Sequence, residues 1–263
     1  MARALRMRIP TGKYIVGVNM HMNRSVAIVL AAGKGKRMNM DRPKQYLLLD
    51  GKPILYYSLK AIEDSFIDRV ILVTAEDDIE YCKQEIVDNY GLKKVAAVVA
   101  GGKERYHSVW KGICQAGDCD YLFIHDGARP FLSQEILTDA YQCVKKCDAC
   151  VAAVPVKDTI KQVDASGKVT HTPKRDELYQ MQTPQTFRFS LIRDAYADLM
   201  KQEEELIKKG ISITDDAMVV ETMTSHDVRI SGGAFTNIKI TTPEDLWIAE
   251  SLIQNMKMQN QKN

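Results

Sequence analysis

Glycines and cations stand together directly after the first strongly apolar stretch of the chain. Residues 26–30 are apolar and mostly β-branched, and the next residues include Gly33-Lys34-Gly35-Lys36-Arg37. Glycines let the backbone come close to a ligand, and exposed N–H groups beside cations bind anions. In doubly wound sheets, the loop after the first strand binds nucleotides. The alternative interpretation is a glycine-rich turn with solvated lysines.

The spacing in this loop argues against two common nucleotide sites. A dinucleotide fingerprint needs a third glycine, but Arg37 and Met38 follow Lys36. A Walker loop needs Ser or Thr after Gly-Lys, and Arg37 stands there instead. Lys44 follows beyond the loop, and two converging cations suit a triphosphate better than a single carboxylate. The alternative is a pair of unrelated surface cations.

Two later loops carry polar residues after apolar stretches. Gly101, Gly102 and Ser108 follow residues 95–100, whereas Asp126 and Arg129 follow residues 121–125. The carboxyl ends of parallel strands open on one edge of a sheet, so these residues are expected to meet there. Ser108 either contacts a nucleotide or caps the next helix. Asp126 is suited to bind Mg²⁺ or a ribose hydroxyl, and Arg129 is suited to bind phosphate. Alternatively, the two residues form an ion pair that fixes the loop.

Further hydroxyls and cations occur later in the chain, and each one alone is a weak signal. They are Thr159, Arg175, Thr183, Thr214 and Lys239. Asp215-Asp216 resembles a general acid–base pair, but capping of a helix by Thr214 or Asp215 is the simpler explanation. No Ser-His-Asp or Cys-His arrangement favours a covalent nucleophile.

Apolar strand-like and helix-like segments alternate from Ser25 onward, which predicts a mainly parallel sheet flanked by helices. The expected strands and helices are strands at 26–30, 69–74, 95–100, 121–125, 150–156 and 237–241, and helices at 53–64, 77–89, 108–116, 133–146, about 192–210 and from 243 on.

The pattern changes after Pro155. Residues 158–171 are expected to form a hairpin that turns at 164–167, and polar chain continues to Gln185. This span has too few apolar residues to form a core alone, so we expect it to lie against another surface, such as a second subunit.

Composition limits the remaining classes. A chain of 263 residues with 45% hydrophobic and 27% charged residues suits one soluble α/β domain. The net charge is +2, but residues 1–24 hold five cations and no acid, which leaves −3 for the rest. A nucleic-acid-binding surface is therefore not indicated, and no apolar run reaches the length of a membrane span. We expect residues 1–24 to be a poorly ordered extension, from an upstream start rather than a targeting signal.

The six cysteines indicate reduced thiols and a cytoplasmic protein. Cys143, Cys147 and Cys150 are close in sequence, but neither a second CxxC nor a spaced His pair completes a metal cluster.

Taken together, the motifs resemble the 2-C-methyl-D-erythritol 4-phosphate cytidylyltransferase family over about residues 25–252. The matching pieces are LAAGKGKRM (30–38), PKQY (43–46), GGKERYHSV (101–109), HDGARPF (125–131), PVKDTIK (155–161), QTPQTF (182–187), TDDA (214–217) and NIKITTPEDLWIAE (237–250). Gly127 stands where many members carry Ala, and we expect this to loosen the loop slightly without changing the chemistry.

The resemblance implies a Rossmann-like nucleotidyltransferase fold at 25–263 and a homodimer whose arms, about residues 156–185, interlock. It also implies Mg²⁺-dependent transfer of a cytidylyl group from CTP to methylerythritol phosphate. The implied roles are as follows: cytidine binding by Ala31, Ala32, Gly33, Gly102 and Ser108; ribose and metal contact by Asp126; catalysis by Arg37, Lys44 and Lys239; substrate binding by Arg129, Thr159, Arg175, Thr183 and Thr214.

Two alternatives remain beside this interpretation. The ribitol-5-phosphate cytidylyltransferases share the reaction and the QTPQTF stretch, but more often have Leu-Ala-Gly-Gly in the first loop and Asp-Ser-Val-Arg-Pro in the fourth. The second alternative is a catalytically silent protein that binds sugar nucleotides. The presence of Arg37, Lys44, Asp126 and Lys239 argues against it, since binding alone does not require every cation.

Overall fold

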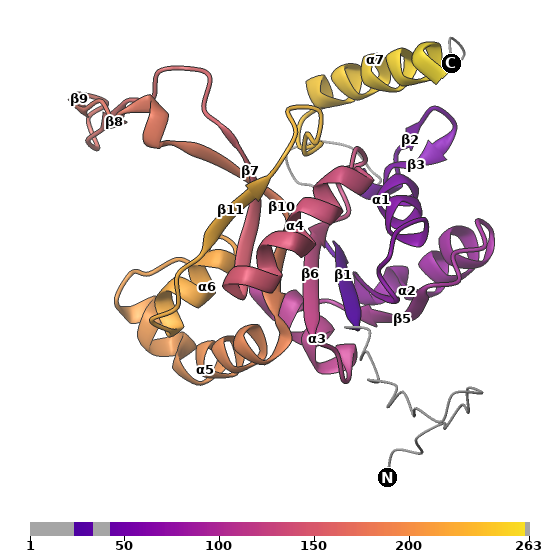
Figure 1. Cartoon of the computed structure of the whole chain (residues 1–263), viewed down its shortest axis with the longest axis horizontal. Helices are drawn as coiled ribbons and strands as arrows, with labels where there is room; N and C mark the ends of the chain where they lie inside the picture. The colour runs from indigo at the N-terminus through magenta and orange to yellow at the C-terminus, as the bar shows by residue number, and fades with distance from the viewer. Residues whose placement is uncertain (1–23, 34–42, 261–263) are drawn as a thin grey trace, which may run out of the picture.

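Seven strands form one central sheet in the computed structural model, which describes residues 24–33 and 43–260 (Figure 1). β10 runs antiparallel to both of its neighbours, and the other adjacent pairs are parallel. The mainly parallel sheet predicted from the sequence is therefore confirmed. The strands, in spatial order, are β11 (Arg229–Gly232), β7 (Ala149–Pro155), β10 (Tyr179–Arg188), β6 (Tyr121–Asp126), β1 (Ser25–Ala31), β4 (Arg69–Thr74) and β5 (Val95–Ala100).

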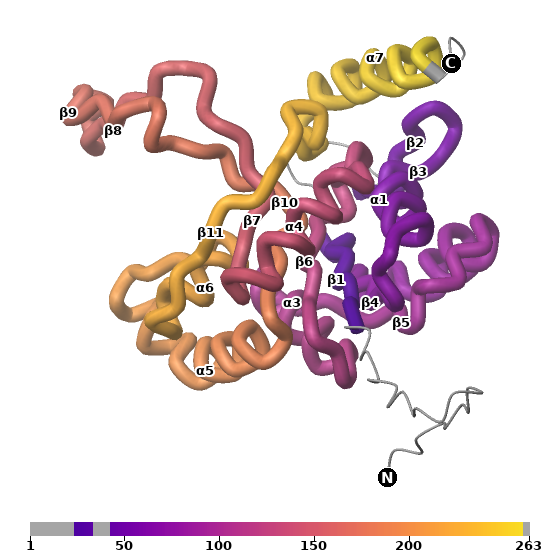
Figure 2. The backbone as a smooth tube through the Cα atoms, viewed as in Figure 1, coloured from indigo at the N-terminus to yellow at the C-terminus, as the bar shows by residue number. Residues whose placement is uncertain are grey.

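Helices cover both faces of this sheet (Figure 2). The central strand β1 is buried on both sides, and its alternate residues enter two different cores. Ala27 and Val29 pack in the core under α1 (Ile54–Glu63) and α4 (Gln134–Cys147). Val26 and Ile28 belong to the core on the other face. That core is closed by α3 (Arg105–Ala116), α5 (Phe189–Lys208) and α6 (Asp216–Met223).

The predicted helix at 77–89 has mixed geometry. It begins as a 3₁₀ turn at Glu76–Asp78, continues as α2 (Ile79–Tyr81) and becomes a π-helix at Cys82–Asp88. By contrast, the predicted cap of α4 is confirmed, because the Ser133 hydroxyl accepts a hydrogen bond from the Ile136 N–H at 3.2 Å.

The predicted strand at 237–241 is wrong. This segment is not in the sheet, and the Ile240 N–H instead donates to the Ala128 carbonyl in the loop after β6 at 2.9 Å. Asn237 is fully buried, and its side-chain amide donates to the Thr183 carbonyl at 2.9 Å. The segment is thus fixed by loop contacts, which an apolar–polar pattern cannot reveal.

Residues 179–185, expected as polar chain, lie in β10, between β7 and β6. The sequence pattern did not predict this strand, because its buried side chains are mostly polar and form hydrogen bonds with specific partners. Gln182 donates to the Ala234 carbonyl at 2.8 Å, and Gln185 donates to the Asp215 carboxylate at 2.8 Å. Burial of such groups requires these bonds, so the strand depends on tertiary contacts that the local sequence does not display.

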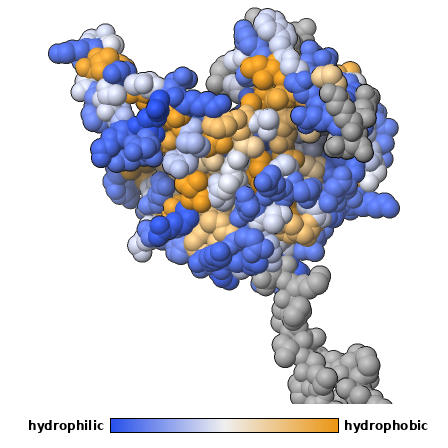
Figure 3. Space-filling model, turned by 45° about the horizontal axis from the view of Figure 1, so that its top comes forward, coloured by the Kyte–Doolittle hydropathy of each residue, from blue (hydrophilic) through white to orange (hydrophobic). Residues whose placement is uncertain are grey.

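Residues 156–178 project from the body as the arm (Figure 1). Near its tip, β8 (Gln162–Val163) and β9 (Val169–His171) pair antiparallel. Asp164 closes the turn by accepting from the Ser166 and Lys168 N–H groups, and Gly167 adopts a φ of 84°. The predicted hairpin is confirmed, while the projecting part ends earlier than residue 185. Figure 3 shows apolar side chains near the tip, where Val163 and Val169 are more than half exposed, at 53% and 51%.

The short strands β2 (Leu48–Leu49) and β3 (Lys52–Pro53) pair beside the terminal helix α7 (Pro243–Asn260). Leu49, Ile54, Phe131, Ile240 and Ile253 form a third apolar cluster there. None of the helices in the described ranges combines the length and apolar character needed to cross a bilayer. The extension predicted at residues 1–24 lies outside the described residues except for Arg24.

Candidate active site

Asp126 ends β6 at the carboxyl edge of the sheet and is the centre of an ion-pair network. Its Oδ2 lies 2.7 Å from Lys239 Nζ, and its Oδ1 lies 3.5 Å from an Arg105 guanidinium nitrogen. Burial alone would raise the pKa of Asp126, but the charges of Arg105 and Lys239 outweigh this effect and hold it well below its usual range. The carboxylate is therefore ionised at neutral pH, and Lys239 lies beside it.

Arg105 connects Asp126 to a second, fully buried carboxylate. Two of its nitrogens donate to Asp216 Oδ1 and Oδ2, each at 2.8 Å, and Tyr196 O–H donates to Asp216 Oδ1 at 2.6 Å. Burial would lower the pKa of Arg105, but Asp216 and Asp126 together raise it above its ordinary value. The sequence patterns assigned no role to Arg105, and Asp216 was considered only as half of an acid–base pair with Asp215, beside the simpler explanation of a helix capped by Thr214 or Asp215. Capping is confirmed only for Asp215, which accepts from the Met218 N–H at 3.0 Å.

His125 and Thr183 hold the backbone at Asp126. His125 Nε2 lies 3.2 Å from the Arg129 carbonyl, which can only accept, so this nitrogen carries the hydrogen. His125 Nδ1 then accepts from Thr183 Oγ1 at 3.0 Å, while that oxygen accepts from the Asp126 N–H at 3.1 Å. Burial lowers the pKa of His125 to about 4. The Thr183 hydroxyl, predicted to bind substrate, is used within the protein.

Gly101 and Gly102 bring the loop after β5 against the loop after β1. A Cβ on Gly101 would lie 2.5 Å from the Ala32 Cβ and 2.8 Å from Ser108 Oγ, so no larger residue fits there. The Gly102 N–H donates to Ser108 Oγ at 3.0 Å. Ser108 lies inside α3, which Glu104 caps, so the capping alternative for Ser108 is wrong. Ser108 instead fastens the glycine turn beside Ala32.

Lys44 joins the same edge from another direction. It begins a 3₁₀ turn at Lys44–Tyr46, and the adjacent Gln45 donates to the Ala31 carbonyl at the end of β1 at 2.6 Å. The Lys44 ammonium donates to the Ile240 carbonyl at 2.7 Å, directly after Lys239 in the chain. Two of the three predicted catalytic cations are therefore brought together. Arg37, the third, lies outside the described residues, and Gly33 is the last described residue before it.

Arg129 is buried beside this network with an incomplete set of partners. Its guanidinium donates to the Asn237 carbonyl at 2.7 Å, while its buried Nε has no hydrogen-bond partner in the described structure. Burial lowers the pKa of Arg129, and among the described residues no carboxylate lies within ion-pair distance of it. A buried cation that is paired only with carbonyls is a good site for an anionic group.

Gly127 precedes this arginine in a tight turn. Its N–H donates to the Leu30 carbonyl at 2.9 Å, and an added Cβ would lie 2.8 Å from Leu55 Cδ1 and 3.0 Å from the Leu30 oxygen. The glycine therefore permits close packing between the ends of β6 and β1. The structure gives no sign of the looser loop expected from the sequence.

Comparison with known proteins shows which family the chain belongs to. The family model described as 2-C-methyl-D-erythritol 4-phosphate cytidylyltransferase matches residues 25–255. The chain belongs to this family. An enzyme of that name from Lachnospira eligens is 48% identical over 226 residues, which are 86% of this chain and 97% of the relative. One from Lachnoclostridium phytofermentans is 45% identical over 233 residues, or 89% and 97% of the two chains.

Solved structures of cytidylyltransferases share the fold. The 4-diphosphocytidyl-2C-methyl-D-erythritol synthase of Anaerococcus prevotii superposes with a TM-score of 0.75 at 32% identity, covering 88% of this chain and 96% of that one. The Francisella tularensis enzyme gives 0.70 at 30% identity, covering 86% and 98%. The resemblance and the Rossmann-like fold inferred from the sequence are confirmed.

Not all the residues predicted for the methylerythritol cytidylyltransferase site come together in one chain. Thr159 and Arg175 are exposed on the arm, and the Arg175 guanidinium donates to the Lys157 carbonyl at 3.3 Å. Thr214 is also exposed, two residues before Asp216. Near Asp126, a single chain thus brings together the loops after β1, β5 and β6 with Lys44 and Lys239, but not the arm residues.

Proposed function

We propose that this protein transfers a cytidylyl group from CTP to 2-C-methyl-D-erythritol 4-phosphate and releases pyrophosphate, in non-mevalonate isoprenoid synthesis. The observation that carries the proposal is the pairing of Lys239 with Asp126 at the sheet edge, with Lys44 donating to the next residue in the chain. The methylerythritol name of the related enzymes favours this substrate over ribitol 5-phosphate.

The reaction needs charge stabilisation more than it needs a base. A phosphate oxygen of the alcohol phosphate forms a bond to the α-phosphorus of CTP, and the bond from that phosphorus to the bridging oxygen breaks. The electron pair leaves on pyrophosphate, and the nucleophile is already an anion. In-line positioning and cations on the developing charge therefore supply the catalysis. Lys44, Lys239 and the predicted Arg37 provide these cations.

The residues that we assign to nucleotide and substrate binding lie at the carboxyl edge of the sheet. We assign cytidine to the backbone surface of Ala31, Ala32, Gly33 and Gly102, with Ser108 holding the glycine turn that approaches Ala32. We assign the substrate phosphate to Arg129, whose buried guanidinium lacks an anionic partner among the described residues. Thr183 then acts as a positioning residue for Asp126, while Thr214 remains a proposed rim residue beside Asp216.

Mg²⁺ fits Asp126 as the cofactor, since an ionised carboxylate is a preferred oxygen ligand for this ion. Mg²⁺ is commonly held by one or two carboxylates together with substrate phosphates and waters, which suits a single Asp at this edge. When bound, the ion neutralises charge on the triphosphate. Asp126 would hold it, and Lys239 would exchange its contact with Asp126 for contact with phosphate.

We also propose a homodimer in which the arm carries Thr159 and Arg175 to the partner's site. Support comes from the exposed position of both residues and from the exposed apolar side chains of Val163 and Val169, which association would cover. Six free cysteines support the cytoplasmic location, where thiols stay reduced.

Pyrophosphate release tests the function. Full-length protein is incubated with CTP and Mg²⁺, with methylerythritol 4-phosphate and ribitol 5-phosphate offered separately. We expect release with the former alone. Preference for ribitol 5-phosphate would change the assigned substrate, and binding of CTP without release in either case would contradict the enzymatic proposal.

A further inference from the structure

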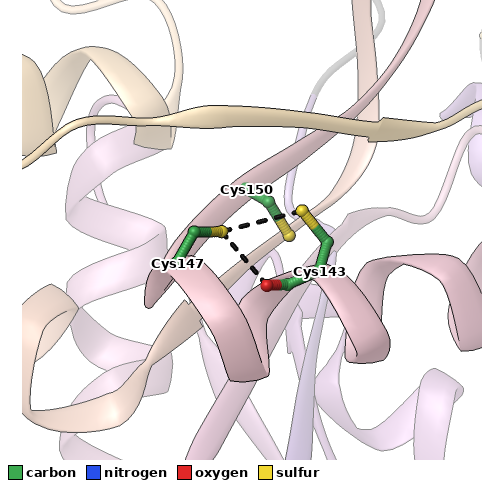
Figure 4. A group of neighbouring side chains, drawn as sticks. All are labelled: Cys143, Cys147 and Cys150. Carbon is green, nitrogen blue, oxygen red and sulfur yellow. Dashed lines mark hydrogen bonds between the residues drawn. The ribbon is translucent and has the colours of Figure 1, made fainter.

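Three thiols converge at a place remote from Asp126. Cys143 and Cys147 lie four residues apart in the last turns of α4, and Cys150 lies at the start of β7 (Figure 4). β6 and β7 are both antiparallel to β10, so Asp126 lies at the end of one strand and Cys150 near the start of the other. The proposed cytidylyl transfer uses none of these thiols.

The geometry fits one metal ion. Cys143 Sγ and Cys147 Sγ are 3.6 Å apart, and the three sulfur atoms all lie within 4.8 Å of one another. A Zn–S distance of about 2.3 Å with tetrahedral angles separates two sulfurs by about 3.8 Å. The observed spacing is far longer than a disulfide bond, and all three cysteines are free thiols.

Backbone carbonyls lie beside all three sulfur atoms. Cys143 contacts the Ile230 oxygen at 3.9 Å, Cys147 contacts the Cys143 and Ala149 oxygens at 3.1 and 3.2 Å, and Cys150 contacts the Ala140 oxygen at 3.4 Å. These contacts tie the end of α4 to β7 and β11 and hold the sulfurs close together.

We propose that Cys143, Cys147 and Cys150 bind one soft d¹⁰ divalent ion, of which Zn²⁺ is the representative. Binding converts three thiols to thiolates, forms three metal–sulfur bonds and releases three protons to solvent, which leaves a complex of charge −1. Cys143 and Cys147 are only partly buried, so water can occupy the fourth position of a tetrahedral ion. The ion would tie the end of α4 to the start of β7.

Titration of the reduced, metal-free full chain with Cd²⁺ tests the proposal, because sulfur–cadmium charge transfer absorbs in the near ultraviolet. We expect saturation at one ion per chain, displacement by Zn²⁺ and no response to excess Mg²⁺, which prefers oxygen ligands. Cys143→Ser and Cys147→Ser should each weaken binding by at least about tenfold, since even an indirect partner of a metal ligand contributes that much.

Cys114→Ser is the matched control, because Cys114 is an exposed thiol on α3 outside the group. It should bind Cd²⁺ like the original protein, and Zn²⁺ should raise its melting temperature but not that of Cys143→Ser. Absorption that persists in the Cys143→Ser/Cys147→Ser double variant would overturn the proposal, as would the absence of a signal in the original protein. Neither result bears on pyrophosphate release, so the function is tested independently.

Discussion

The carboxyl edge of the sheet and the arm both carry residues predicted for one active site, but they are built in opposite ways. At the edge, Asp126 and Asp216 are buried and their charges are met by Lys239 and Arg105. On the arm, Arg175 is exposed and donates to the nearby Lys157 carbonyl. The edge is organised by the fold of one chain, whereas within residues 24–33 and 43–260 no hydrogen bond or ion pair joins Arg175 to the network around Asp126.

The charged residues of the edge and of the arm contribute differently to stability. At the edge, removal of one partner leaves a buried ion, so the network stabilises the fold as well as serving chemistry. On the arm, the charged side chains are solvated and contribute little to the stability of the fold. Their role is therefore to contact a substrate or a second chain. Matched substitutions should therefore lower stability at the edge and leave it unchanged on the arm, whereas substitutions in both regions should lower catalysis.

Arg105→Ala should give the largest loss of stability. It leaves Asp216 fully buried with Tyr196 as its remaining side-chain partner, and breaking such a pair costs about 3–5 kcal/mol. Urea denaturation measures the free energy of unfolding, with Arg175→Ala as the control from the arm. We expect the control to unfold like the original protein. Equal stability of the two variants would show that the edge network is not structural.

Lys239→Ala should lower turnover by about 10²–10³-fold, as loss of one donor to a developing charge does. Lys44→Ala should cost on the order of 10²-fold for the same reason. Steady-state pyrophosphate release measures both. Lys161→Ala is the control, because Lys161 is an exposed arm lysine bonded to Thr172 Oγ1 at 2.7 Å. Unchanged rates in the Lys44 and Lys239 variants would remove them from the proposed chemistry.

The sequence predicted the parts of the fold that depend on local apolar patterns, but not those that depend on contacts between distant residues. Apolar runs such as 95–100 and 121–125 predicted β5 and β6, and the glycines and cations after them marked the edge where Asp126 lies. β10 was missed, and the segment at 237–241 was wrongly predicted as a strand, because Gln182, Gln185 and Asn237 are stabilised by distant partners. The role of Arg105 was also hidden, since its two carboxylates lie 21 and 111 residues away.

His125 makes the edge sensitive to pH. Burial lowers the pKa of His125 in the folded protein from 6.5 to about 4. Between these two pH values, His125 therefore binds a proton in the unfolded chain but not in the folded one. Stability is therefore full above the unfolded value and falls as pH drops through this window, by about 2 kcal/mol between about pH 7 and pH 5. Urea denaturation at both pH values measures the loss.

His125→Gln should reduce this pH dependence, because it removes the titrating group. The exposed His171 of the arm supplies the control, and His171→Gln should leave the dependence intact. A dependence that is equal in both variants would assign it to other groups.

Arg175→Ala should have the smallest effect, a loss of about 10- to 100-fold in kcat/KM, since one hydrogen bond to a charged group contributes about 1.5–3 kcal/mol. If the arm serves the partner's site, a chain with Arg175→Ala and a chain with Lys239→Ala carry their defects in different sites. Their heterodimer then has one site with both changes and one with neither. Equal amounts that are unfolded and refolded together should recover roughly a quarter of the original activity, because half of the dimers are mixed and each has one intact site. If each arm served its own chain, every site would keep one defect, and activity would stay near the mean of the two variants. Recovery in the mixture thus distinguishes a site shared between subunits from one completed within a single chain.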